Sequence, residues 1–150
     1  MDRKTRQTYQ TIYEWAEKAE RPGGEFDWFA VDSDGHLAAF ATAGFGPVPD
    51  SFFSLGLNSY LNLVGLVDDK LKGTRPVHSG GFLPYSERGF YAYDFRTTGS
   101  GQYEIAAIPS TPLRLPDAVV LGFSQDMFVE FAGKFSESKE VIPEVFWNCR

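Results

Sequence analysis

Reactive and metal-binding side chains are scarce in this chain of 150 residues, which has one cysteine, Cys149, and two histidines, His36 and His78. A single cysteine excludes an intrachain disulfide, so the composition does not require an oxidising compartment. Zinc sites need Cys or His ligands at short, fixed spacings, and His36 has no such neighbour. The sequence therefore predicts no metal site and no cofactor.

Long apolar runs are also missing. No segment approaches the roughly 18–20 consecutive apolar residues of a membrane span, and the polar start MDRKTRQTYQ does not resemble a secretory signal. We therefore expect a cytoplasmic chain without membrane contacts. With 43% hydrophobic and 16% aromatic residues, the chain has enough apolar material for one globular domain over residues 1–150.

Positive charge is absent from the middle of the chain. Residues 26–69 contain six aspartates and no Lys or Arg, whereas acids and bases balance in residues 1–25 and 70–150, so the whole net charge of −6 lies in this middle segment. Proteins that bind nucleic acids usually gather Lys and Arg to meet phosphate, so direct nucleic-acid binding is not expected. An acidic surface suits a basic partner, or serves only solubility.

Hydrophobic periodicity predicts two main helices. Residues 5–20 carry apolar side chains at helical spacing, and the stretch RPGGE ends that pattern. A more apolar helix is expected over residues 58–72, with Asn58 as a candidate cap at its start and Gly73 at its end. The prolines and glycines of residues 74–88 indicate a loop.

Short apolar runs predict two hairpins. GFYAYDF and QYEIAAI, joined by RTTGSG, form the clearer one, and DWFAV and LAAFATA on either side of DSDGH form the other. Further along, residues 117–122 indicate a short helical turn and MFVEFA a strand. The expected fold class is therefore α+β, with an antiparallel sheet of four to six strands packed against two main helices.

The DSDGH stretch holds a dense group of acids beside a histidine. An EF-hand alignment with Gly35 at the sixth loop position puts Ala30 and Ala41 at the first and twelfth positions, where oxygen ligands are required. Asp-Gly between two apolar runs is instead a strong hairpin signal, because glycine accepts the positive φ of tight turns. DSDGH is therefore predicted to be a turn.

Catalytic patterns are weak. His78 and Ser79 are adjacent, but no GxSxG elbow surrounds the serine, and GFGP at residues 44–47 lacks the Lys and Ser/Thr of a phosphate-binding loop. We therefore expect no enzymatic activity and assign no catalytic residue. A small hydrolase or ligand-binding domain that uses the loop around His78 stays open as an alternative.

The order of these features resembles the immunity proteins of bacterial polymorphic toxin systems. The resemblance lies in the N-terminal helix and in FDWFAVDSDGHLAAFATAGFGPVP, LNSYLNLVGLV and GFYAYDF…QYEIAAI, about two thirds of the chain. It implies a small, acidic, cytosolic protein that binds and neutralises a cognate toxin by occlusion, without chemistry of its own. It assigns no interface residues, no toxin and no oligomeric state. A regulatory protein-interaction module without a toxin is a further alternative.

A basic toxin cleft would be complementary to the acidic segment. Asp32, Asp34, Asp68 and Asp69 are the predicted partner-binding residues, acting as a surface that speeds encounter more than it strengthens binding. The competing interpretation is that they form a turn and a solvated helix end.

Overall fold

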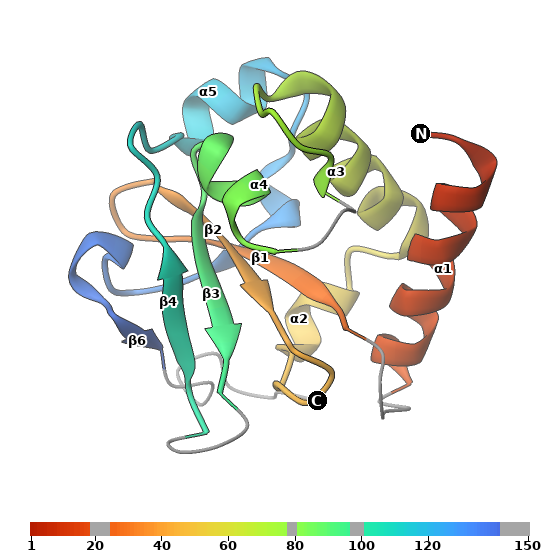
Figure 1. The fold of residues 1–150 in the computed structure, drawn as a ribbon, viewed down its shortest axis with the longest axis horizontal. Helices are drawn as coiled ribbons and strands as arrows, with labels where there is room; N and C mark the ends of the chain where they lie inside the picture. The colour runs from red at the N-terminus through yellow and green to blue at the C-terminus, as the bar shows by residue number, and fades with distance from the viewer. Residues whose placement is uncertain (19–24, 78–80, 97–100, 142–150) are drawn as a thin grey trace.

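The computed structural model describes residues 1–18, 25–77, 81–96 and 101–141 (Figure 1). The helices are α1 (Arg3–Glu17), α2 (Asp50–Phe53), α3 (Leu57–Lys70), α4 (Leu83–Glu87), α5 (Leu115–Val120) and the 3-10 helices η2 (Gln125–Met127) and η3 (Phe135–Glu137). The strands are β1 (Asp27–Val31), β2 (Leu37–Ala41), β3 (Tyr91–Phe95), β4 (Tyr103–Ala107), β5 (Val129–Glu130) and β6 (Glu140–Val141). Four features of the sequence lie wholly or partly outside the described residues: the predicted RPGGE stop, the His78–Ser79 pair, the RTTGSG connection and Cys149.

The six strands form one mixed sheet in the order β5-β1-β2-β3-β4-β6. The pairs β1/β2, β3/β4 and β4/β6 are antiparallel, while β1/β5 and β2/β3 are parallel. The predicted α+β class, strand number and two long helices are confirmed, but the sheet is not wholly antiparallel. The reason is the connection between β2 and β3, residues 42–90, in which α2, α3 and α4 return the chain to the end where β2 began.

Both predicted hairpins are present. β1 and β2 pair with Val31 opposite Leu37, so DSDGH forms the turn between them as predicted. Gly35 in this turn has a φ of +81°, a conformation that favours glycine. β3 and β4 form the second hairpin, with a register shift between Ala92 and Tyr93.

The Asp32 carboxylate organises the first turn. Its Oδ1 accepts the backbone N–H groups of Asp34 at 2.9 Å and His36 at 2.8 Å. Its Oδ2 accepts the backbone N–H of Phe135 at 2.9 Å, from η3 in the C-terminal segment. One buried side chain therefore closes the hairpin turn and fastens a segment more than a hundred residues away to it.

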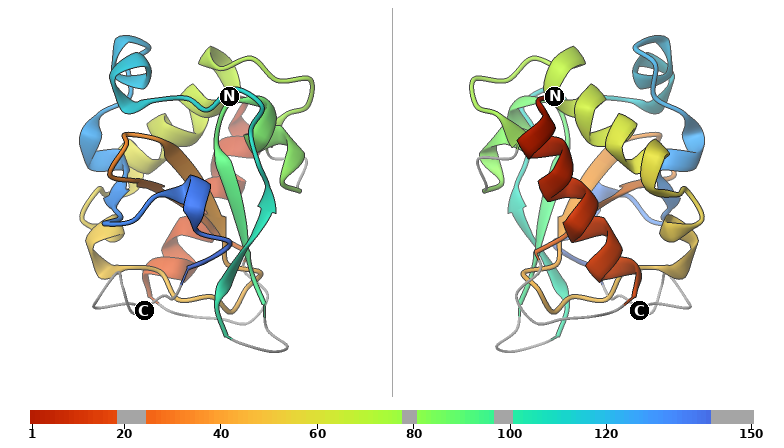
Figure 2. Two further views of the ribbon diagram at one scale, coloured as in Figure 1. Left: turned by 90° about the vertical axis from the view of Figure 1, so that its left-hand side faces the viewer. Right: turned by 90° about the vertical axis from the view of Figure 1, so that its right-hand side faces the viewer.

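Both faces of the sheet are covered. Helices α1, α3 and α4 lie on one side, while the C-terminal segment that contains η3 lies on the other, as the two panels of Figure 2 show. On the helical face Phe29 meets Tyr85 of α4, with ring centroids 5.8 Å apart. On the opposite face Phe40 meets Phe135 of η3 at 6.1 Å. Alternate strand residues thus serve two halves of one hydrophobic core.

Three aromatic rings stack across the central strands on the face turned toward η3. Trp28 of β1 lies on Phe40 of β2 with centroids 4.3 Å apart, and Phe40 lies on Tyr93 of β3 at 4.7 Å. All three side chains are fully buried. Because they also occupy paired positions of adjacent strands, the stack fixes the register of β1, β2 and β3.

The second predicted helix is α3, with different ends. Its N-cap residue is Gly56 instead of Asn58, and its C-cap is Leu71 instead of Gly73. Gly73 packs against the buried Arg88 side chain, because a Cβ at this position would overlap with the Arg88 guanidinium. Small size at residue 73 is therefore required by packing and not by a helix end.

The predicted loop over residues 74–88 contains the helix α4, whose second residue is Pro84. Proline is compatible with a first helical turn, where no intrahelical N–H donor is needed. Arg88 follows α4 and is buried. It donates to the carbonyls of Val67 at 2.8 Å and Pro84 at 2.9 Å and pairs with Asp68 at 3.3 Å, which fastens α4 to the end of α3.

We expect Asp32→Ala to lower the free energy of unfolding by about 2–4 kcal/mol, because three backbone donors lose a charged acceptor. The matched control is Asp34→Ala in the same turn, where the side chain is 43% exposed and the cost should stay within about 0.5 kcal/mol. Urea unfolding followed by tryptophan fluorescence measures both. Equal losses for the two variants would contradict the assigned role of Asp32.

Candidate functional site

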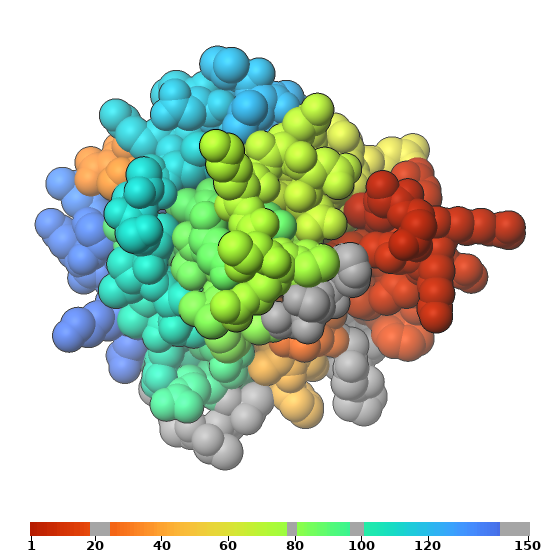
Figure 3. All heavy atoms as spheres, turned by 45° about the horizontal axis from the view of Figure 1, so that its top comes forward, coloured from red at the N-terminus to blue at the C-terminus, as the bar shows by residue number. Residues whose placement is uncertain are grey.

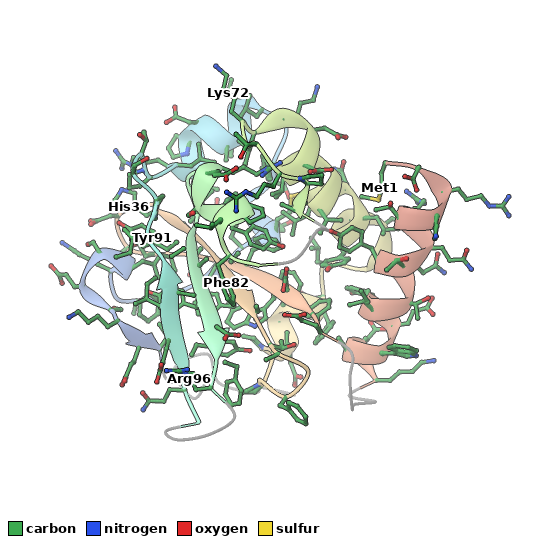
Figure 4. The ribbon with its side chains drawn as sticks, viewed as in Figure 1. Met1, His36, Lys72, Phe82, Tyr91 and Arg96 are labelled. Atoms are coloured by element: carbon green, nitrogen blue, oxygen red, sulfur yellow. The ribbon has the colours of Figure 1, made fainter. Side chains whose placement is uncertain are left out.

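A cavity of about 220 Å³ opens between α1, the sheet and the segment that leads into α4. Tyr9 of α1 and Tyr60 of α3 line it, Asp27 and Ala41 form its floor on the sheet, and Phe82 lines it from the segment before α4. Phe82 is labelled in Figure 4. We call this cavity the α1 pocket.

Asp27, the first residue of β1, lies half-buried on the pocket floor. Its Oδ2 accepts a hydrogen bond of 2.5 Å from the Tyr85 hydroxyl of α4. Burial raises the pKa of Asp27 to about 6; the Tyr85 hydrogen bond opposes the rise, and the negative charges of Glu25 and Asp94 add to it. The Asp27 carboxyl therefore changes its charge close to neutral pH.

A second carboxyl lies in the same row of the sheet. Asp27 is opposite Ala41, and Ala41 is opposite Asp94 of β3, so two acids flank one small residue on the helical face. The pKa of Asp94 is also raised, chiefly by burial, while the charge of Arg96 opposes the rise. Negative charge at either acid makes ionisation of the other less favourable.

Apart from Glu25, the described residues that form the walls of the α1 pocket are uncharged, and three of them are aromatic. The Tyr9 and Tyr60 rings meet edge to face with centroids 6.4 Å apart, and Tyr60 stacks on Phe26 at 5.2 Å. Burial is the main cause that raises the pKa values of Tyr9, Tyr60 and Tyr85, so their hydroxyl groups are neutral at pH 7. A carboxyl that titrates near pH 6 inside such a cavity can exchange a proton or hold a positively charged group.

The four predicted partner-binding aspartates do not gather in one cluster. Asp32 and Asp34 lie in the β1–β2 turn, and Asp68 and Asp69 lie in the last turn of α3. The Asp32 side chain is fully buried, Asp34 pairs with Lys134 at 3.7 Å, and Asp68 belongs to the arginine contact that joins α3 and α4. Asp69 is exposed.

Helix α5 links the β1–β2 turn to α3, the two elements that carry these aspartates. Leu115 at its start donates its backbone N–H to the Gly35 carbonyl of the β1–β2 turn at 2.8 Å. Gly122, just after it, lies against Leu66 of α3, where an added Cβ would be 3.5 Å away. Figure 3 shows α5 and the end of α3 together at the top of the molecule.

Three successive aliphatic side chains are exposed at the end of α5. Val119, Val120 and Leu121 expose 49%, 85% and 38% of their surface. We call residues 119–121 the α5 tip. Asp34 lies in the turn that bonds to the start of α5, and Asp69 lies in the last turn of the helix whose Leu66 faces Gly122, so both acids belong to elements that border α5. Lys72, labelled in Figure 4, follows the end of α3. The α5 tip is therefore an apolar surface on a helix bordered by elements that carry charged residues.

Reading the sequence for motifs missed both the α1 pocket and the α5 tip. The signal for the pocket was strand periodicity: Asp27 shares its face of β1 with the buried Phe29, and Asp94 shares its face with Phe90. An acid on a core-facing position indicates a buried carboxyl that needs an explanation. The tip had no comparable sequence signal, because apolar residues next to each other in this short helix differ in burial: Ala118 is buried, whereas Val119 is exposed.

No protein-family model, no curated protein and no solved structure matches this chain. Within the residues that the structure describes, no helix is both long enough and apolar enough to cross a membrane. The resemblance to immunity proteins stays an expectation, so function has to be argued from the α1 pocket and the α5 tip.

We expect Asp27→Asn to raise stability at pH 7 by about 1–2 kcal/mol, with half-burial limiting the effect. The folded-state pKa of about 6 lies above the ordinary value of 3.8, so the native state binds the proton more tightly. The contribution of Asp27 to stability is therefore largest below pH 4 and falls as pH rises toward 6.

Urea unfolding of the wild type and Asp27→Asn from pH 4 to 7 measures this effect, and the difference between them removes contributions of the other acids. The two curves should coincide near pH 4 and separate above it, with the variant more stable. Parallel curves over this range would contradict the raised pKa of Asp27.

Proposed function

We propose that this chain is an immunity protein that binds a cognate bacterial toxin in the cytoplasm and neutralises it by occlusion, without enzymatic chemistry of its own. The observation that carries this proposal is the α5 tip, an exposed run of three aliphatic side chains. Exposed apolar surface with a polar rim is typical of protein–protein contact sites. A few such anchors, once buried in a complex, supply most of the binding energy.

The charges around the tip support a basic partner, in a narrower form than the sequence alone predicts. Asp69 at the end of α3 is exposed, and the Asp34 side chain in the β1–β2 turn is 43% exposed, so these two are the candidates for steering a partner. Asp32 serves the turn and Asp68 binds Arg88, so both act inside this protein. Lys134 beside Asp34 weakens the local negative field.

Immunity proteins are encoded beside the toxin that they inhibit, so the product of the neighbouring gene is the partner to test. Val120→Asp should abolish protection against it, because the substitution introduces a charge at the centre of the apolar contact. The Val120 side chain is 85% exposed, so the fold should not change. We expect toxin affinity to fall by about thirtyfold or more, since a buried anchor typically contributes 2 kcal/mol or above.

Growth on co-expression and binding to the purified toxin domain measure the two effects. Ile108→Asp is the matched control, because Ile108 is 68% exposed but lies outside the tip, and this variant should protect normally. Full protection by Val120→Asp would exclude the α5 tip as the anchor.

Salt dependence tests the steering role of the acids. Asp69→Asn and Asp34→Asn should each slow toxin association by about two- to fivefold at low ionic strength, with dissociation little changed. The difference should vanish at high salt, because exposed charges are then screened. Glu140→Gln, an exposed acid on the edge strand β6, is the control. Association rates that do not respond to salt or to either aspartate would remove Asp34 and Asp69 from the interface.

The α1 pocket favours a second candidate function, that of a ligand-binding domain. Val77 and Gly81, which line the pocket, stand on either side of His78 in the sequence.

A regulatory interaction module would also use the α5 tip, and co-expression separates it from an immunity protein: a module of that kind restores no growth in the presence of the neighbouring gene's product.

A further inference from the structure

The α1 pocket combines three features that together suit a ligand. Its volume of about 220 Å³ far exceeds the roughly 10–15 Å³ that one water molecule requires. Its floor carries the Asp27 carboxyl, whose hydrogen-bond partner is the neutral Tyr85 hydroxyl. Its walls include the rings of Tyr9, Tyr60 and Phe82. A carboxylate in such a place is costly unless a positive group accompanies it.

We propose that the α1 pocket binds an organic cation, a primary alkylammonium or guanidinium group, with Asp27 as its counter-ion. The carboxylate accepts the N–H donors of the cation while Tyr85 continues to donate to Oδ2. The faces of Tyr and Phe rings attract a cation within about 6 Å, and the apolar stem of an amine or guanidine packs along Ile12 and Val77.

The charges of the lining select for a cation. Glu25 and Asp27 line the pocket, and Asp94 lies in the same row of the sheet, whereas no Lys or Arg is present among the described residues that line it. An anion would meet the two acids of the lining, with a third in the same row of the sheet. A hard metal ion is also unsuited, since it requires about six oxygen ligands and the described residues hold no group of three or more metal-binding side chains.

This inference does not depend on toxin binding, because no residue of the α5 tip or of the β1–β2 turn lines the α1 pocket. The same positive group occurs in a free amine or guanidine and in a Lys or Arg side chain of a protein partner. Both sources share the chemistry that Asp27 recognises.

The titration of Asp27 gives the site a pH dependence. Its pKa lies at about 6 without a cation, and a bound cation lowers it, so affinity should be constant above pH 7 and fall about tenfold per unit below pH 6. The titratable groups that act on or contact Asp27 are Glu25, Asp94 of β3, Tyr9 of α1, Tyr60 of α3 and Tyr85 of α4. The three tyrosines stay neutral over this range, so the acids alone set the profile.

The test measures binding of n-butylammonium, n-butylguanidinium and the neutral 1-butanol to the full chain at pH 7.5 and low salt, by NMR shifts of the tyrosine rings. Both cations should bind at least tenfold more tightly than the alcohol. Equal affinity for the alcohol and the cations, or no saturable binding of either cation, would overturn the proposal.

Two variants connect the binding to the residues. Asp27→Asn keeps the acceptor for Tyr85 and should weaken both cations at least tenfold while leaving 1-butanol unchanged. Glu140→Gln, which changes an exposed acid on β6, should alter the affinity of neither cation. Tyr9→Leu should weaken the cations about three- to tenfold through loss of a ring face. Unchanged cation affinity in Asp27→Asn would overturn the proposal even if binding itself is observed.

Blocked lysine and arginine, which carry capped backbone groups, identify the source of the cation. If they bind as tightly as the bare cations, the pocket admits a Lys or Arg side chain of a protein partner, with its charged end entering first. If they bind much more weakly than the bare cations, the pocket serves a free amine or guanidine. Either result supports a cation site, and the affinity of the bare cations remains the measurement that decides whether the site exists.

Discussion

The stack of Trp28, Phe40 and Tyr93 is the contact on which the rest of the arrangement depends. These rings occupy paired positions on three neighbouring strands, two of which belong to parallel partners that no short turn holds in register. A shift of one residue would turn each ring toward the opposite face. The residues adjoining the stack are Asp27, Ala41 and Asp94, so the same register that buries the rings on one face aligns two acids around a small residue on the other.

A tension between stability and binding follows from that alignment. An aromatic core of this density can tolerate an unfavourable group, and the raised pKa of Asp27 shows that its ionised form is unfavourable in the folded protein. Residues that lower stability without a structural benefit often mark binding sites. Asp32 provides the contrast. It is the same residue type and is more deeply buried, but its carboxylate accepts hydrogen bonds from three backbone N–H groups and so stabilises the fold itself.

Local patterns predicted what local interactions determine. The hairpin around Gly35 and the helices α1 and α3 follow from turn chemistry and periodicity, and they appear where the sequence indicates them. The parallel pairing of β2 with β3 was not predictable, because it depends on where a 49-residue helical connection, residues 42–90, returns the chain. The end of α3 was missed for a related reason, since Arg88 from beyond α4 binds the Val67 carbonyl that a cap would otherwise have served.

The α1 pocket shows that tertiary contacts also limit the prediction of functional sites from the sequence. Strand alternation puts Asp27 on a core face, but only the fold brings Tyr9 from α1 and Tyr85 from α4 to it. Likewise, four aspartates that look alike in the sequence divide into a turn former, an arginine partner and two exposed acids once their neighbours are known. Composition identified the acidic segment, whereas tertiary contacts decide which of its charges another molecule can meet.

The edges of the sheet have a consequence for strand pairing between copies of this chain. The four central strands are five residues long and strongly apolar, which makes each a template for pairing with another copy during folding. Among the described residues, the outermost strands β5 and β6 have two residues each, and each includes an exposed glutamate, Glu130 or Glu140. Such short, charged borders offer an incoming strand few hydrogen bonds and an unfavourable charge, so the growth of intermolecular sheets is discouraged where an aromatic-rich core would otherwise invite it.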